Sequence, residues 1–309
     1  MMMQIRNGAD LLAICREKAM PLHQVMLAYE SKKSGKTTAE IFALMRTQLQ
    51  VMYSSTQQGL SENSNLQGQI IGGEAKKLKQ RSQKTKPVCG YTMARAVSFA
   101  LSVTEVNASM GRIVAAPTAG ASGVLPGVLF SLAETHQLAE DQLVEGLFTA
   151  GAVGLVIAKN ASLSGAAGGC QAEIGSASAM AAAAAVELVK GSPEQALHAA
   201  AIALKNLLGL VCDPVAGLVE SPCSKRNAVG TANALVAAEM ALAGIESVIP
   251  FDEVVAAMYQ VGRTLPLTLR ETAEGGLAIT PTGIKLKKKI LGENDDQSAC
   301  SACGECSQA

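Results

Sequence analysis

Long apolar stretches of alanine, glycine and other small residues most constrain how this chain can fold. The segment SASAMAAAAAV at residues 176–186 is the clearest example. The whole chain of 309 residues is 49% hydrophobic but only 3% aromatic, with 29 glycines and no tryptophan. Small side chains let helix backbones pack closely, and valine and isoleucine do not form the alternating pattern of strands. The sequence therefore predicts a mainly α-helical, Ala/Gly-rich multi-helix domain.

The C-terminal two-thirds alternates apolar helical patterns with loops rich in glycine and proline. At most a small β element is expected, near residues 210–219. Helices are predicted over residues 128–137, 141–159, 171–190, 193–208, 227–243 and 252–261.

The N-terminal third carries recognisable helix starts. Asn7 is a predicted N-cap, Pro21 opens a second helix, and two further helices are expected over residues 38–53 and 91–107. Residues 59–90 contain a polar, glycine-rich stretch and a basic run, which predict either a functional loop or a flexible crossover. Residues 1–292 are expected to form one helical domain, and residues 293–309 a flexible cysteine-containing tail.

Charge and hydropathy indicate which classes of partner to expect. The 26 basic residues balance 26 acidic ones, which predicts no binding to nucleic acid. Prolines and glycines interrupt the charge-free stretch 113–133, so no membrane span is expected. The N-terminus lacks a signal-peptide pattern, which predicts a cytoplasmic protein. In that compartment the eight cysteines are expected to be thiols, metal ligands or catalytic groups rather than disulfides.

Three central cysteines are the first candidate site. Cys170 ends a GAAGGC loop, and Cys212 and Cys223 bracket the segment CDPVAGLVESPC. No CxxC spacing joins them, so the spacing does not indicate a zinc site. Each cysteine lies at a helix end, where backbone N–H groups can face a cluster sulfur or an anion. The alternative is that all three are small buried hydrophobic residues.

A second candidate is the loop PTAGASG at residues 117–123. It precedes an apolar helical run, an arrangement in which exposed N–H groups bind carboxylate or phosphate, although a simple tight turn is an equal alternative. Lys225 and Arg226 could hold a substrate carboxylate, and Asn227 could cap the next helix. The candidate substrate-binding residues are Thr118, Gly120, Ser122, Gly123, Lys225 and Arg226.

The C-terminal run Cys300, Cys303 and Cys306 has the spacing of iron–sulfur or zinc ligands. It could bind a second cluster, reach back to the first, or remain a set of free thiols.

Four longer motifs resemble those of a known protein family. They are GGEAKKL from Gly72, VTEVNASMGRIVAAPTAGASGVLPG from Val103, SGAAGGCQAEIGSASAMAAAA from Ser164, and CDPVAGLVESPCSKRNAVGTANA from Cys212. Over residues 8 to 290 the chain resembles the α chain of the iron–sulfur-dependent bacterial L-serine dehydratases. The resemblance implies a [4Fe–4S] cluster held by Cys170, Cys212 and Cys223, with one iron open to substrate.

The implied reaction is β-elimination of L-serine to pyruvate and ammonia. An open-site iron would act as a Lewis acid on the departing hydroxyl group while a base removes the α-proton. The motifs do not identify that base, which can lie on a partner chain.

The family also has a further domain or separate β chain with a Ser/His-rich motif, and this sequence has no His-Thr pair. A β chain and a hetero-oligomer are therefore expected. Cys303 or Cys306 is a candidate cap on the open iron, as in single-chain relatives.

Two other functions remain as alternatives. A pyridoxal-phosphate lyase would use Lys225 for the Schiff base and the PTAGASG loop as its phosphate cup. A non-enzymatic helical scaffold or cluster carrier would use only the cysteine tail.

Overall fold

The computed structural model describes residues 4–292, and these residues form 13 α-helices without a β-strand. This confirms the predicted mainly α-helical fold. The first five helices are α1 Gly8–Lys18, α2 Leu22–Ser34, α3 Thr38–Leu60, α4 Glu74–Lys84 and α5 Tyr91–Ala108. The others are α6 Val124–His136, α7 Glu140–Asn160, α8 Gly165–Gly168, α9 Ser176–Leu188, α10 Pro193–Lys205, α11 Cys223–Leu242, α12 Phe251–Thr264 and α13 Pro281–Leu291.

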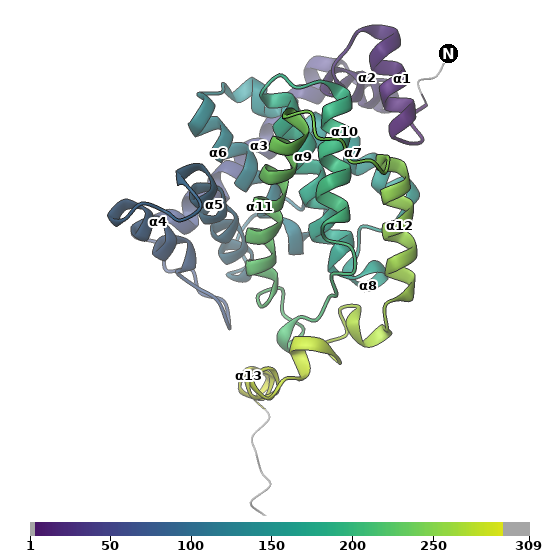
Figure 1. Ribbon diagram of the computed structural model, residues 1–309. Coiled ribbons are helices and arrows are strands. Elements are labelled where there is room, and N and C mark those ends of the chain that lie inside the picture. The colour runs from purple at the N-terminus through teal and green to yellow at the C-terminus, as the bar shows by residue number, and fades with distance from the viewer. Residues whose placement is uncertain (1–3, 293–309) are drawn as a thin grey trace, which may run out of the picture.

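The alanine-rich helix α9 forms the centre of the bundle. All of its residues except Glu187 are buried, as expected for a helix that is apolar on every side. It packs against α6, α7, α10 and α11, which surround it in Figure 1. Contact with α11 is close, because Ser178 of α9 donates a hydrogen bond of 2.8 Å to the backbone carbonyl of Gly230 in α11. Small residues therefore set the spacing between the central helices.

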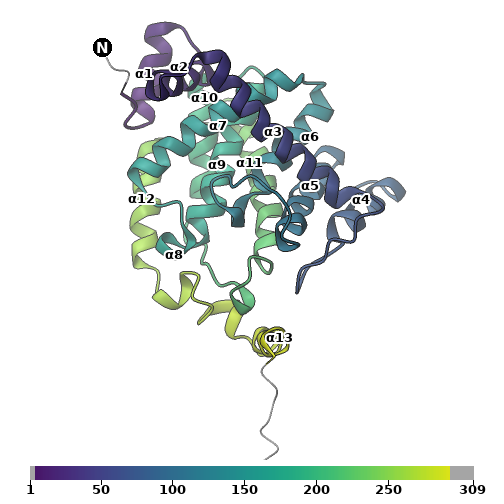
Figure 2. The same cartoon turned by 180° about the vertical axis from the view of Figure 1, so that it is seen from behind.

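The longer N-terminal helices cover one side of this bundle. Figure 2 shows α3 crossing the face opposite to the view of Figure 1, and α3 packs against α5, α6 and α7. Leu49 and Met52 of α3 are buried in the common core. The N-terminal third is thus part of the same packed domain.

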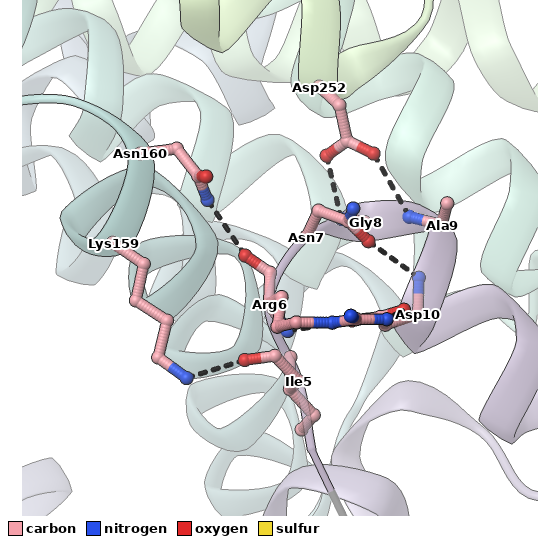
Figure 3. Close-up of polar contacts among 9 residues, drawn as sticks. All are labelled: Ile5, Arg6, Asn7, Gly8, Ala9, Asp10, Lys159, Asn160 and Asp252. Carbon is pink, nitrogen blue, oxygen red and sulfur yellow. Dashed lines mark hydrogen bonds and ion pairs between the residues drawn. The ribbon is translucent and has the colours of Figure 1, made fainter.

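Polar contacts hold the start of the chain against distant helices (Figure 3). The predicted cap is confirmed, since Asn7 Oδ1 accepts a hydrogen bond of 2.8 Å from the backbone N–H of Asp10. The Asp252 carboxylate accepts bonds from the N–H groups of Gly8 and Ala9 at 2.6 and 3.0 Å. The negative charge of Asp252 also interacts favourably with the positive end of the α1 dipole.

Helix α7 is long and apolar enough to cross a membrane by composition alone. In the structure, 67% of its most apolar window is buried inside the protein. It packs against α2, α3 and α9, so its hydropathy is accounted for by the core.

Several predicted boundaries differ from the structure. Helix α6 begins at Val124 rather than at residue 128, because proline is tolerated in the first turn of a helix. Helix α11 begins at Cys223, so the prediction that Asn227 caps it is wrong. Residues 171–190 are not one regular helix, since Gln171–Gly175 forms a π-helical turn before α9. Helix α13 has no counterpart among the predicted helices.

The predicted β element near residues 210–219 is reduced to one isolated bridge between Cys212 and Arg270. One short 3-10 turn, η3 Val215–Gly217, occurs in this segment. The other 3-10 turns of residues 4–292 are η1 Ala119–Ala121, η4 Leu267–Leu269 and η5 Gly276–Ile279.

Candidate thiol site

Three loops bring the central cysteines together, and the first of these loops follows the short helix α8. Cys170 follows Gly169, whose φ of +76° favours glycine, and precedes the π-helical turn. Cys212 is anchored by its backbone, since its N–H donates to Leu269 O at 2.9 Å. Cys223 is the first residue of α11. All three side chains are buried, and none forms a disulfide.

The buried amide of Gln171 aligns two of these loops. Its Nε2 group donates to Gly168 O and Met258 O, and its Oε1 atom accepts from the N–H of Gly209. The backbone N–H of Gln171 also donates to Leu210 O at 2.9 Å. These bonds connect the Cys170 loop, α12 and the segment that leads to Cys212.

The three thiols influence one another electrostatically. The Cys212 thiol hydrogen-bonds to Cys170 and lowers the pKa of Cys170, and the positive charge of Arg226 acts in the same direction. The same thiol–thiol bond raises the pKa of Cys212. Burial raises the pKa of Cys223 to about 12. Deprotonating all three thiols would therefore need a strong positive charge among them, such as bound metal provides.

The donor set fits an iron–sulfur cluster chemically. Thiolates are the usual protein ligands of such clusters, and each can bind a different iron. Within residues 4–292, no group of three or more histidine, cysteine or acidic side chains is arranged to hold a single metal ion.

A buried carboxylate lies next to the thiols. Glu173 is 9% exposed, and Thr118 Oγ1 donates to its Oε1 atom at 2.7 Å. Burial is the main cause that raises the pKa of this carboxyl group. A Cβ added at Gly165 would lie 2.7 Å from Glu173 Oε2 and 2.9 Å from Cys212 Sγ. The carboxylate and the thiol therefore lie close to the same side of Gly165. The sequence motifs do not single out Glu173, since an acid in a helical pattern is normally solvated; its position inside the apolar run QAEIGSASAM was the available signal.

The PTAGASG loop contributes unequally to the site. Thr118 bonds to Glu173, and the α-carbon of Gly120 faces the same carboxylate. Ser122 is buried, and its hydroxyl group donates to Ala119 O and stabilises the turn. A Cβ at Gly123 would lie 2.5 Å from Ala100 O, which indicates a packing role.

Asn227 fastens this loop to α11. Its Oδ1 atom accepts from the N–H of Gly123 at 2.9 Å, and its Nδ2 group donates to Gly120 O at 2.7 Å. The loop beside Glu173 is thus held by the helix that begins at Cys223.

The two predicted basic residues lie in different surroundings. Arg226 is largely buried, forms an ion pair of 2.9 Å with Asp213, and donates to Val211 O at 2.7 Å. Lys225 is 57% exposed and pairs with Glu74 at the start of α4. Arg226 therefore lies near the thiols, while Lys225 contacts the crossover segment.

Two buried carboxylates hold the crossover in place. Glu220 accepts hydrogen bonds from the N–H groups of Gln69, Ile70 and Ile71 at 3.0, 2.7 and 3.0 Å. Glu105 Oε1 accepts from the first two N–H groups of α4 at 2.5 and 3.0 Å. These contacts tie the segment to the loop between Cys212 and Cys223 through Glu220, and to α5 through Glu105. Cys303 and Cys306 lie outside the described residues.

Comparison with known proteins identifies the family. The family model for the serine dehydratase alpha chain matches residues 17–278. The chain is 54% identical over 287 residues to the probable L-serine dehydratase, alpha chain, of Bacillus subtilis (strain 168), covering 93% of this chain and 95% of that one. It is 45% identical over 291 residues to the L-serine dehydratase, alpha chain, of Peptoniphilus asaccharolyticus, covering 94% and 100%. The L-serine dehydratase of Streptomyces coelicolor is longer: the match, 37% identical, covers 89% of this chain but 60% of that protein. This chain belongs to the serine dehydratase alpha chain family.

Proposed function

We propose that this chain is the α chain of a two-chain L-serine dehydratase, which converts L-serine to pyruvate and ammonia in the cytoplasm. The observation that carries the proposal is the buried group of three thiols beside Glu173, in a chain that matches the alpha-chain family over most of its length. Residues 1–292 would form the catalytic domain.

We further propose that Cys170, Cys212 and Cys223 hold a [4Fe–4S] cluster. When bound, the cluster supplies a Lewis-acidic iron that polarises the departing hydroxyl group of serine. Arg226 would stabilise the Cys170 thiolate through its charge, while Asp213 keeps its side chain oriented. Burial of the thiols would keep bulk water from the ligands.

The substrate carboxylate would lie between the 118–123 segment and Arg226. The segment contributes backbone N–H groups, and Arg226 contributes positive charge. The Thr118 hydroxyl donates its hydrogen bond to Glu173 instead. Lys225 would mainly help to hold the segment 59–90 in place through its ion pair with Glu74. A cap on the open iron by Cys303 or Cys306 stays a prediction.

A separate β chain is proposed from the names and lengths of the relatives. The two relatives described as alpha chains match this chain over 95% and 100% of their lengths, while the longer L-serine dehydratase is matched over 60%. The additional length in the longer protein would correspond to the β chain here.

The environment of Lys225 argues against the pyridoxal-phosphate alternative. A Schiff-base lysine needs a lowered pKa, normally through burial or a neighbouring cation. Lys225 is more than half exposed and pairs with the carboxylate of Glu74, so it has neither the burial nor the neighbouring cation.

The test is an assay of the anaerobically purified chain, alone and co-expressed with its β chain. We expect pyruvate release from L-serine in the co-expressed sample, with a broad absorption typical of a cluster. Iron-containing protein that forms no pyruvate in either sample would support the cluster-carrier alternative, and a band near 420 nm abolished by borohydride would support pyridoxal phosphate.

A further inference from the structure

Glu173 is a buried acid without a matching cation. Among residues 4–292, no lysine, arginine or histidine forms an ion pair with it, and its hydrogen bond comes from the neutral hydroxyl of Thr118. The nearby guanidinium of Arg226 is already paired with Asp213. The negative charge of Glu271 further disfavours ionisation of Glu173.

Such an arrangement is unfavourable unless something balances it. A buried carboxylate loses its hydration, and proteins normally compensate with an ion pair or several hydrogen bonds. Buried Glu220 shows the compensated case in the same chain, because three backbone N–H groups bond to it. Glu173 has one donor, so a further positively charged donor would complete its surroundings.

The walls around Glu173 leave its carboxylate facing the thiols. A Cβ at Gly120 would lie 3.2 Å from Oε1, and one at Gly165 would lie 2.7 Å from Oε2. An added Cβ at Gly165 would force a shift, and one at Gly120 would need the carboxylate to give by a few tenths of an ångström. Since the same Gly165 position is 2.9 Å from Cys212 Sγ, a small molecule bound at the thiols has Glu173 within reach.

We propose that Glu173 binds the α-ammonium group of the amino-acid substrate and selects it over analogues without nitrogen. The inference rests on the proposed function and adds a specificity residue to it. The ammonium provides the missing positive charge and a charge-assisted hydrogen bond to a carboxylate oxygen. Thr118 is the positioning residue that orients the carboxylate from its other side.

The test compares two ligands that cannot undergo elimination. L-Alanine keeps the ammonium and carboxylate groups, whereas propanoate lacks the ammonium. Binding of both is measured by equilibrium dialysis on the anaerobic two-chain holoenzyme, alongside the KM for L-serine. We expect wild-type protein to prefer L-alanine and Glu173→Gln to lower that preference by about tenfold or more, because a partner of a desolvated charge pair is lost.

The matched control is Glu274→Gln, which removes an exposed carboxylate from a site other than the proposed one. It should leave the ligand preference unchanged. Glu173→Asp, which keeps the charge, should retain a measurable preference for L-alanine.

Each outcome separates the two proposals. Wild-type holoenzyme without serine dehydration would refute the proposed function. Active wild-type protein together with an unchanged preference in Glu173→Gln would refute the role of Glu173. If Glu173→Gln loses iron, Thr118→Val replaces it, since this change removes the hydrogen bond that orients the carboxylate; an unchanged preference there also overturns the inference.

Discussion

Replacing Glu220 with alanine should release the crossover segment from the cysteine loop. The Glu220 carboxylate is 5% exposed and accepts three backbone N–H groups, from Gln69, Ile70 and Ile71. A hydrogen bond to a charged group contributes roughly 1.5 to 3 kcal/mol, so three bonds set an upper range of about 4.5 to 9 kcal/mol. Water can reach the freed donors once the segment opens, which lowers the expected loss to about 3 kcal/mol.

Hydrogen exchange measured by mass spectrometry reports this opening locally. A loss of about 3 kcal/mol corresponds to about a hundredfold faster exchange for protected amides of residues 67–72. Exchange in the central helix α9 should stay unchanged if the opening is local.

The matched control lies on the same segment. Glu62→Gln removes a carboxylate that is 67% exposed and 3.9 Å from the Lys79 ammonium, so it should leave exchange unchanged. Equal exchange in wild-type and Glu220→Ala protein would refute the view that this carboxylate holds the crossover.

Two further predictions concern buried titratable groups. Burial raises the pKa of Glu105 in the folded state, so protonation of Glu105 stabilises the folded protein. This contribution to the free energy of unfolding is fully present below the ordinary glutamate pKa and is lost as the pH rises through the raised pKa. Glu105→Gln keeps an oxygen that can accept from both N–H groups of α4 but does not titrate. The free energy of unfolding in urea should therefore depend less on pH in this variant, and an unchanged pH dependence would contradict the raised pKa of Glu105. Burial also raises the pKa of Cys15 to about 11, so alkylation of the native protein at about pH 8 should modify exposed Cys89 and spare Cys15. Equal labelling of the two thiols, read by peptide mass mapping, would show that the Cys15 region is open.

The fold class could be predicted because the strongest local signals agree with the final packing. Alanine-rich periodic segments form the central helices, and Asn7 caps α1 as its position indicates. The start of α11 could not be predicted, because Pro222 and Cys223 carry no ordinary cap and the helix start depends on the loop before it. The π-helical turn at Gln171–Gly175 likewise depends on tertiary contacts of Gln171 with Gly209 and Met258.

The candidate site was only partly visible in the sequence. Cys170, Cys212 and Cys223 stand out by residue type and by the motifs around them, and the structure brings their thiols together. Glu173 and Glu220 do not stand out, because their importance comes from burial beside residues distant in the chain. Lys225 and Arg226 look alike in sequence, yet one pairs with Glu74 and the other with Asp213.

Cys170, Cys212 and Cys223 are the three cysteines proposed to hold the cluster. The direct measurement is the iron and acid-labile sulfide content of anaerobically purified two-chain protein, with Cys170→Ser, Cys212→Ser and Cys223→Ser each compared with wild type. Cys15→Ser is the matched control, since Cys15 is also a buried thiol but lies in α1. We predict about four irons per α chain in wild type and in the control, and loss of iron in each of the other three variants. Full iron content in all three variants would contradict their role as cluster ligands and would indicate that these cysteines are only buried core residues.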